Sequence, residues 1–343
     1  MVKKKINLAL QGGGAHGAYT WGVLDRLLEE DDLEISAISG TSAGALNGAA
    51  LKAGMISGGR QGARDNLDWL WQKVSGVGES QLSGWLAPFG VAAISRAMEY
   101  SWHSAVSTAM TQIVSPYAYG PAYKNPLREI VEKFNYDLVC GQDAPRLFVG
   151  ATKVRDGKIK VFEGDEIGPD ALLASACLPT LFQAVDIPDP VTGKSEAYWD
   201  GGYTGNPALF PLYTRNLPPD IVIININPFE RADLPKTPIE IQNRINEISF
   251  NSSLLRELRA IEFVQRLLDM GRIEEGQMNR VYIHMIADDD LMSKLSTATK
   301  TVPNPAVISA LRAAGRASAA RFLTHDIDHV GKRSSVDLKT MFS

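Results

Sequence analysis

Residues 35–53 read ISAISGTSAGALNGAALKA, and this stretch decides the fold. Its first part, Ile35 to Ser39, is a strand candidate, and the small residues from Ala45 to Ala53 predict a helix. The five residues between them, Gly40-Thr41-Ser42-Ala43-Gly44, fit the pattern G-x-S-x-G. In that pattern the two glycines permit a tight strand-to-helix turn, which forces the serine side chain outward. The stretch therefore predicts a turn that presents Ser42 as a nucleophile.

A similar unit precedes this one. Ile6 to Leu10 is a strand candidate, glycines occupy positions 12–14, and a helix is expected from about His16 to Glu30. Strand, helix, strand and helix in succession call for a parallel sheet with helices on both faces. We therefore expect an α/β fold in which the two glycine-containing turns lie side by side.

The first turn, Gln11-Gly12-Gly13-Gly14-Ala15-His16-Gly17, is suited to stabilising negative charge. Ester hydrolysis passes through a tetrahedral oxyanion, and backbone N–H groups aimed at that oxygen contribute about 10²–10³ in rate per donor. The helix that begins after Ser42 adds free N–H groups and its positive dipole end. The expected oxyanion-hole residues are Gly12, Gly13, Gly14, Ala15 and Ala43, of which Gly13, Gly14 and Ala15 are the candidate donors in the first turn.

The same turn also matches G-x-G-x-x-G, the pattern of a dinucleotide-binding Rossmann unit. That alternative expects an acidic residue at the end of the second strand, where it binds ribose. Here the second strand ends in Ser39-Gly40, and the nearest acids precede it. The pattern does not favour nucleotide binding.

A carboxylate that could serve Ser42 occurs at Asp200-Gly201-Gly202, after the aromatic pair Tyr198-Trp199. On its own, this tripeptide is typical of an ordinary turn. Because the serine needs a base, Asp200 is the candidate. A solvated aspartate with a pKa near 4 is a weak base for an alcohol, so we expect Asp200 to be at least partly buried.

Together these motifs resemble the patatin-like phospholipase family. The glycine-rich turn, the serine turn and Asp200-Gly201-Gly202 follow the family's order, and Ala174 to Phe182 (ASACLPTLF) is similar to its A-S-x-A-x-P-x-x-F segment. The resemblance spans residues 6–212. It implies a three-layer α/β/α fold and a Ser42–Asp200 dyad that acts on lipid acyl esters without a metal or cofactor. His16 stands where the family usually has a basic residue, and Gly17, Gly201 and Gly202 belong to the motifs.

Further strands are expected at Arg146–Gly150, in a hairpin over Thr152–Phe162 that turns at Asp156-Gly157, and at Ile221–Ile226 and Val281–Ile286. Helices are expected over Asn125–Phe134, over Pro238–Met270 and from Asn304 onward. We expect one patatin-like hydrolase domain over residues 1–320 and a polar tail over 321–343.

Residues 60–123 are rich in aromatic and methionine side chains at helical spacing, without clear strands. We interpret them as a helical insertion over the sheet. Two interpretations stay open: these side chains form the core of ordinary helices, or residues 85–123 border and partly cover an acyl-chain pocket. If residues 85–123 cover an acyl-chain pocket, a secondary expectation is that they contact the surface of a membrane.

The composition restricts partners and compartment. Lys and Arg number 35 against 39 Asp and Glu, a net charge of -4, so no basic field favours nucleic acid. The two cysteines, Cys140 and Cys177, suggest neither a disulfide framework nor a metal site, which favours a reduced, cytoplasmic compartment. The apolar run after Lys3-Lys4-Lys5 is too short for a signal peptide, and no run of about 18 apolar residues predicts a membrane span.

Two other functions stay open. An acyltransferase would use the same acyl-enzyme, although acyltransferases of the malonyl-transfer type carry G-H-S where this chain has Gly40-Thr41-Ser42. A protein that binds lipid without catalysis would tolerate the loss of Ser42. The expected substrate is a phospholipid or another acyl ester.

Overall fold

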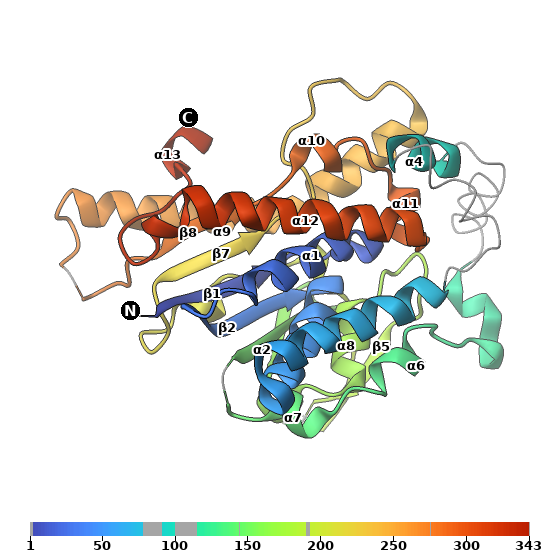
Figure 1. The fold of residues 1–343 in the computed structure, drawn as a ribbon. Helices are drawn as coiled ribbons and strands as arrows, with labels where there is room; N and C mark the ends of the chain where they lie inside the picture. Colours follow the sequence, from blue (N-terminus) through green and yellow to red (C-terminus); the bar gives the residue numbers. More distant parts are fainter. Residues whose placement is uncertain are drawn as a thin grey trace.

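We describe a computed structural model of the chain over residues 3–77, 91–99, 115–143, 145–189, 193–274 and 276–342. Within these residues, eight strands form one mixed sheet in the order β5-β6-β3-β2-β1-β7-β8, with β4 paired to β3 (Figure 1). The strands are β1 (Lys4–Leu10), β2 (Leu33–Thr41), β3 (Arg146–Lys153), β4 (Ile159–Glu163), β5 (Val185–Pro188), β6 (Ser195–Asp200), β7 (Asp220–Ile224) and β8 (Tyr282–Ile286).

Strands β3, β2, β1, β7 and β8 run parallel to one another, whereas β4, β5 and β6 add antiparallel pairings at one side. Leu10 at the end of β1 pairs with Gly40 of β2 on one side and with Ile224 of β7 on the other. The carboxyl ends of these three strands therefore meet at one edge, which is where ligands bind in open parallel sheets.

Helices and shorter helical turns connect the strands. Their bounds are η1 (Gly14–His16), α1 (Gly17–Leu27), α2 (Ala43–Val77), α4 (Val91–Glu99), η3 (Pro116–Ala122), α6 (Arg128–Val131), α7 (Tyr136–Cys140), η4 (Gly164–Glu166), α8 (Pro169–Ser175), η5 (Gly201–Tyr203), η6 (Phe210–Tyr213), α9 (Pro238–Asp269), α10 (Asp289–Met292), α11 (Thr297–Thr301), α12 (Pro305–His325), η7 (Ile327–His329) and α13 (Leu338–Met341). None of the described helices combines the length and the apolar character needed to cross a bilayer.

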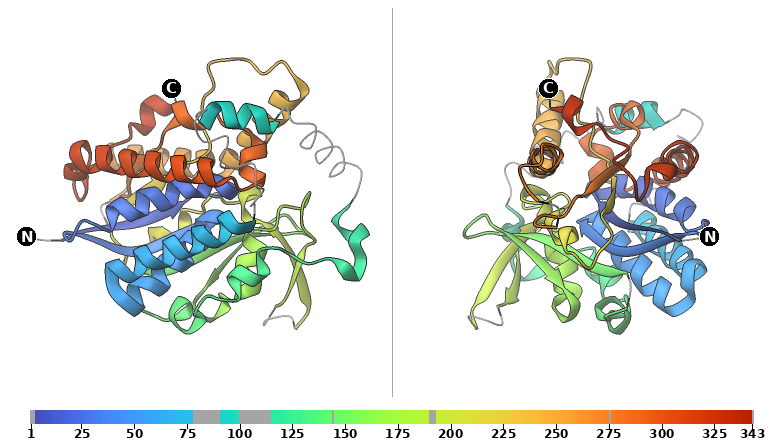
Figure 2. Two further views of the ribbon diagram at one scale, coloured as in Figure 1. Left: turned by 45° about the vertical axis from the view of Figure 1, so that its right-hand side comes forward. Right: turned by 90° about the vertical axis from the view of Figure 1, so that its left-hand side faces the viewer.

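The sheet separates two apolar cores because successive side chains of a strand point to opposite faces. Leu8 and Leu10 of β1 pack with side chains of α1, α2 and α12 on one face. Ala9, between them, packs with Leu254 and Leu258 of α9 on the other. Figure 2 shows α9 on the opposite side of β7 from α1 and α12. The sheet is thus the middle of three layers.

The expected α/β class with a largely parallel sheet is confirmed, and so is the hairpin at Asp156-Gly157 between β3 and β4. The hairpin of β5 and β6 was not expected, and Asp200 is the last residue of β6 rather than part of a free turn. The short run Ser195–Asp200 lacks a clear alternation of polar and apolar residues, and its partner segment is equally short. Pairing with β3, which no local pattern encodes, makes it a strand.

The expected insertion is described only in part. Helix α2 continues from the serine turn to Val77, with non-helical backbone at Gly58 and Gly59. In its second half, Trp71 is buried and its ring stacks on Trp21 of α1 at 6.2 Å between centroids. Trp85, Phe89 and Trp102, which belong to the stretch 85–123 that is expected to border an acyl-chain pocket, lie outside the described residues. The cover, the domain over 1–320 and the tail over 321–343 stay predictions.

Candidate active site

Ser42 occupies a strained turn between β2 and α2. Its φ is 55°, and it is the one non-glycine residue with positive φ in the described part of the chain. Non-glycine residues in this region are uncommon and cluster at functional sites. The flanking glycines are required by packing, since a Cβ on Gly40 would lie 2.6 Å from the carbonyl oxygen of Gly44, and one on Gly44 2.1 Å from that of Leu10. Ser42 itself is 6% exposed.

The backbone of the turn is held by Ser175, the last residue of α8. Its Oγ accepts a hydrogen bond of 2.9 Å from the backbone N–H of Ser42 and donates one of 2.7 Å to the carbonyl of Gly150. The N–H of Ser42 is therefore engaged and is not free to face an oxyanion. Ser175 was not singled out in the sequence, although the segment Ala174–Phe182 contains it.

Asp200 is fully buried at the end of β6. Its Oδ1 accepts a hydrogen bond of 2.8 Å from the N–H of Gly202, and its own N–H donates to the carbonyl of Cys177 over 2.8 Å. Its carbonyl oxygen accepts a bond of 2.8 Å from the hydroxyl of Thr152. Hydrogen bonds thus hold the side chain of Asp200 as well as its backbone N–H and carbonyl groups, which fixes the position of the carboxylate. Gly201 fits because a Cβ there would lie 2.3 Å from the carbonyl oxygen of Gly150.

Strand pairing brings Ser42 and Asp200 together. Thr41, next to the serine, pairs with Gly150 of β3, and the following residue of β3, Ala151, pairs with Asp200. Burial raises the pKa of Asp200 to about 7, against the opposing effects of the Gly202 N–H and the Ser42 hydroxyl. Its second oxygen, Oδ2, is buried and has no hydrogen bond of full geometry from the described residues. Hydrogen bonds between catalytic groups are often long in the absence of substrate.

The glycine-rich turn lies directly against the serine turn. A Cβ on Gly12 would lie 2.7 Å from the carbonyl oxygen of Thr41 and 2.8 Å from the Cβ of Ser42. The N–H of Gly12 donates to Oδ1 of Asn206 over 2.6 Å, so this amide is engaged. The other amides expected at the oxyanion hole have no hydrogen-bond acceptor among the described residues: Gly13, Gly14, Ala15 and Ala43.

His16 faces the interior of the protein. It is buried, and its Nε2 lies 2.8 Å from the hydroxyl of Thr299 in α11, while Nδ1 has no partner among the described residues. Burial, followed by the charge of Lys300, lowers its pKa well below the ordinary value. His16 is therefore neutral at pH 7 and does not supply the positive charge that its sequence position suggests.

A group of amide side chains supports the glycine-rich turn from behind. Asn227 donates to the carbonyl of Gly12 over 3.0 Å, and Asn206 donates to the same oxygen over 3.3 Å. Gln11 accepts from the N–H groups of Ile226 and Asn227, at 2.8 and 2.9 Å. None of these three side chains was expected from the sequence. The sequence could have indicated two of them only by their positions: Asn206 lies shortly after Asp200-Gly201-Gly202, and Asn227 lies shortly after the end of β7.

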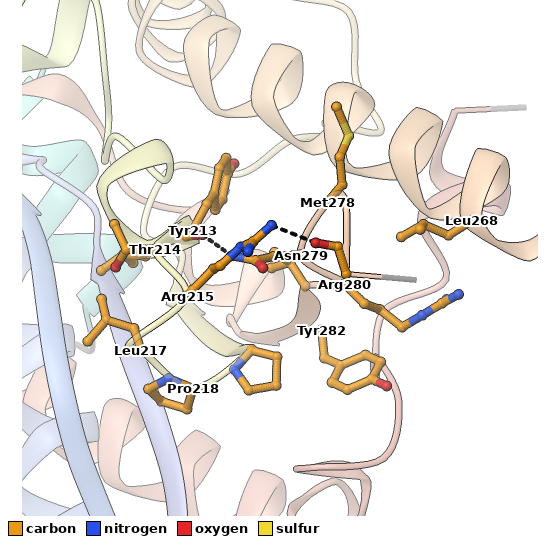
Figure 3. A pocket seen from close by; sticks show the side chains of 14 residues that line it. Tyr213, Thr214, Arg215, Leu217, Pro218, Leu268, Met278, Asn279, Arg280 and Tyr282 are labelled. Carbon is orange, nitrogen blue, oxygen red and sulfur yellow. Dashed lines mark hydrogen bonds between the residues drawn. The ribbon is translucent and has the colours of Figure 1, made fainter. Parts of the chain in front are cut away.

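Neither of two surface pockets in the described residues includes Ser42 or Asp200. One, of about 480 Å³, is lined by Tyr213, Arg215 and Tyr282 among others and lies near the amino ends of β7 and β8 (Figure 3). The other, of about 580 Å³, lies between Tyr123, Asp170 and Gln183. The dyad candidates are instead enclosed by their own turns. In the same part of the chain, no group of three His, Cys, Asp or Glu is placed to hold a metal ion.

A family model described as patatin-like phospholipase matches residues 8–213 of the chain. No curated protein sequence matches the chain significantly. Among solved structures, the chain is similar to VipD from Legionella pneumophila, at 13% identity and a TM-score of 0.42, over 94% of this chain and 67% of VipD. It is also similar to the type III effector protein ExoU of Pseudomonas aeruginosa, at 14% identity and a TM-score of 0.34, over 95% of this chain and 54% of ExoU.

Proposed function

Because the chain belongs to the patatin-like phospholipase family, we propose that it hydrolyses acyl ester bonds of phospholipids or related lipids through an acyl-enzyme on Ser42. The family resemblance drawn from the sequence motifs is thereby confirmed. The observation that carries the proposal is the pairing of a positive-φ serine with a buried aspartate whose pKa lies near 7. A carboxylate of that basicity is matched to proton transfer at neutral pH.

In the first half of the reaction, Asp200 accepts the hydroxyl proton of Ser42 as Oγ attacks the ester carbonyl carbon. The carbon–oxygen bond to the leaving alcohol then breaks, the proton passes to that alcohol, and an acyl-enzyme remains. In the second half, Asp200 removes a proton from water. The water oxygen bonds to the acyl carbon, the bond from that carbon to Oγ of Ser42 breaks, and the proton passes from Asp200 to Oγ, which releases the fatty acid and restores Ser42.

The negative charge that develops on the carbonyl oxygen in both halves needs donors. The amides of Gly13, Gly14, Ala15 and Ala43 are suited to this because they have no acceptor among the described residues. The first three follow Gly12, which lies against Ser42, and Ala43 follows Ser42 directly. Ala43 is also the first residue of α2, so the dipole of that helix favours an anion there. The amide of Gly12 is excluded because Asn206 accepts its hydrogen bond.

Labelling with a fluorophosphonate probe tests the nucleophile, since only an activated serine reacts. We expect stoichiometric labelling of the wild type, none of Ser42→Ala, and normal labelling of Ser195→Ala, which alters an exposed serine at the start of β6. Release of free fatty acid from a phospholipid should follow the same pattern. Unchanged turnover in a folded Ser42→Ala variant would refute the assignment of the nucleophile. Absence of both labelling and fatty acid release in the wild type would favour a protein that binds lipid without catalysis.

The acceptor of the acyl group separates a hydrolase from an acyltransferase. We propose water as the acceptor, so fatty acid release should continue at an undiminished rate when glycerol is added. A fall in fatty acid release that is matched by new ester would assign an acyltransferase instead.

A lipid substrate resides in a bilayer, so we also propose peripheral contact between the protein and membranes. Ser42→Ala should bind substrate without turning it over, so it is the suitable variant for a vesicle flotation assay. If it failed to float with phosphatidylcholine vesicles or with vesicles containing anionic lipid, membrane contact would be excluded. The cytoplasmic compartment expected from the cysteines stays a prediction.

A further inference from the structure

The peptide bond between Gly12 and Gly13 is held at its carbonyl end. Its oxygen accepts hydrogen bonds from Nδ2 of Asn227 at 3.0 Å and from Nδ2 of Asn206 at 3.3 Å. In a planar trans peptide the N–H points opposite to the C=O. Anchoring the oxygen of Gly12 therefore also sets the direction of the Gly13 N–H, one of the proposed oxyanion donors.

The orientation of Asn227 is in turn set by Lys300. An asparagine amide has an acceptor end and a donor end, and its neighbours decide which way it faces. The ammonium of Lys300 donates to Oδ1 of Asn227 over 2.7 Å. A lysine ammonium has only donors, so it fixes Oδ1 toward itself and turns Nδ2 toward the carbonyl of Gly12. The backbone of Asn227 is held independently, through its N–H to Gln11.

Lys300 lies in α11 and reaches the loop from the far end of the chain. Its own carbonyl oxygen would lie 2.2 Å from a Cβ on Gly14, so α11 also packs directly on the glycine-rich turn. Burial lowers the pKa of Lys300 to about 8, with Glu247 opposing that effect and Arg231 adding to it. At pH 7 Lys300 is therefore the cation beside this turn, while His16 is neutral.

We propose that Lys300 is a positioning residue for the oxyanion hole, acting through Asn227 on the Gly12–Gly13 peptide and placing a positive charge beside it. The position lies outside residues 8–213, which the family model matches. Lys300 supplies the positive charge that His16, which lies in the turn itself but is neutral, does not supply. The inference rests on the proposed hydrolase function.

The test compares Lys300→Met with Lys300→Arg and with Lys294→Met, a control at an exposed lysine nearby. Loss of one oxyanion donor lowers kcat by about 10²–10³, so a donor that is present but misaligned should cost about 10-fold or more. We expect Lys300→Met to lower kcat on that scale, with KM within about twofold of the wild type. Lys300→Arg should recover most of the rate, because a guanidinium can still donate to Asn227, and Lys294→Met should match the wild type.

Asn227→Asp gives a second variant if Lys300→Met folds poorly. The carboxylate keeps a partner for Lys300 but cannot donate to the carbonyl of Gly12, so the same fall in kcat is expected. Equal kcat in both variants and the wild type would overturn the proposal. So would a parallel change in KM and kcat that arginine does not rescue.

A spectroscopic measurement separates this proposal from the proposed function. In protein labelled with ¹⁵N-glycine, the amide signal of Gly13 should shift in Lys300→Met and Asn227→Asp and stay in place in Lys294→Met. That result supports the positioning role even if the wild type released no fatty acid, an outcome that would refute only the hydrolase assignment. An unshifted Gly13 signal in folded Lys300→Met would refute the positioning role, whatever the activity.

Discussion

The Nε2 atom of His284 lies 2.9 Å from Oδ1 of Asp220, and both side chains are buried. On the other side of the ring, Nδ1 lies 3.2 Å from the hydroxyl of Ser335. The arrangement has the residue types of a Ser-His-Asp triad. It lies at the amino end of β7, however, whereas Ser42 follows the carboxyl end of β2.

The position of this cluster suggests a structural role. Asp220 also accepts a hydrogen bond of 2.9 Å from the N–H of Gly331, and the N–H of Ser335 donates to the carbonyl of Ile283. The cluster therefore ties residues 331–335 to the start of β7 and β8. From Asp220 to Ile224 the strand extends by about 13 Å, which separates the cluster from the edge where Ser42 lies.

We predict that His284→Ala destabilises the protein without removing the nucleophile. The substitution leaves a buried carboxylate with fewer partners, which should cost on the order of 1–3 kcal/mol of unfolding free energy. Denaturant melts should show this loss, while fluorophosphonate labelling below the melting temperature should match the wild type. His325→Ala, at the exposed end of α12, serves as the control and should change neither quantity. If folded His284→Ala lost labelling as completely as Ser42→Ala, the dyad would have to be replaced by a triad.

The pH dependence of Ser42 reactivity should report on Asp200. Because burial raises the pKa of Asp200 to about 7, the carboxylate is mostly protonated at pH 5 and mostly ionised at pH 8. Only the ionised form can accept the serine proton, so labelling should accelerate as pH rises, with a midpoint near 7. Initial labelling rates from pH 5 to pH 9 measure this. A rate that is constant above pH 5 would mean that a carboxylate of ordinary pKa, or a different group, serves as the base.

Asp200 should also lower the free energy of unfolding above pH 7, since its buried carboxylate is charged there. Between about pH 4 and pH 7 the native state keeps a proton that the unfolded chain has lost, so the free energy of unfolding falls as pH rises through that window. A pKa near 7 in place of about 4 corresponds to a cost of up to about 4 kcal/mol above pH 7. Asp200→Asn has no such charge and keeps an acceptor for the Gly202 N–H.

We therefore predict that Asp200→Asn is inactive yet more stable than the wild type at pH 8, and that the difference disappears toward pH 4. Urea unfolding at several pH values measures it. Asp186→Asn, at an exposed aspartate of β5, should leave both activity and the pH dependence of stability unchanged. An Asp200→Asn variant that is less stable than the wild type at pH 8 would show that the carboxylate is not destabilised by its burial.

Local sequence predicted those parts of the candidate site that are built from single turns. Gly12, Ser42 and Asp200 each lie in a short motif whose glycines the backbone requires, and the first two motifs predicted that their turns lie side by side on a parallel sheet. The supporting side chains could not be predicted in this way. Ser175, Asn227 and Lys300 become neighbours of the two turns only through pairing and packing between distant segments. Ser175 lies in the family-like segment Ala174–Phe182, but that segment does not indicate which groups its hydroxyl binds.

The same reasoning explains why Asp200 was identified but β6 was not. A glycine pair after an acidic residue is a local signal, whereas the strand depends on β3 as its partner. His16 shows a different limit of local sequence, since it stands where the family usually has a basic residue and the motif does not reveal its surroundings. Its burial against Thr299, in a helix more than 280 positions later, makes it neutral instead.

The glycine-rich turn and the serine turn are in close contact at Gly12. Gly12 has room for no side chain, because a Cβ would lie 2.7 Å from the carbonyl oxygen of Thr41 and 2.8 Å from the Cβ of Ser42. Both contacts are with the serine turn, whose position depends on backbone that cannot move aside cheaply. Gly12→Ala should therefore push the oxyanion loop and the nucleophile apart, and a displacement of 1 Å can cost about 100-fold in rate.

Gly76→Ala is the matched control, since no atom of the described residues lies within 4 Å of a Cβ at that position and alanine favours the helix. We expect Gly12→Ala to lower kcat by about 100-fold or more and Gly76→Ala to leave kcat unchanged with equal or higher stability. Esterase kinetics on a short-chain acyl ester, together with thermal melts of both variants, measure this. Near-normal kcat in folded Gly12→Ala would mean that the two turns need not touch for catalysis, and the oxyanion hole would then have to be assigned to other amides.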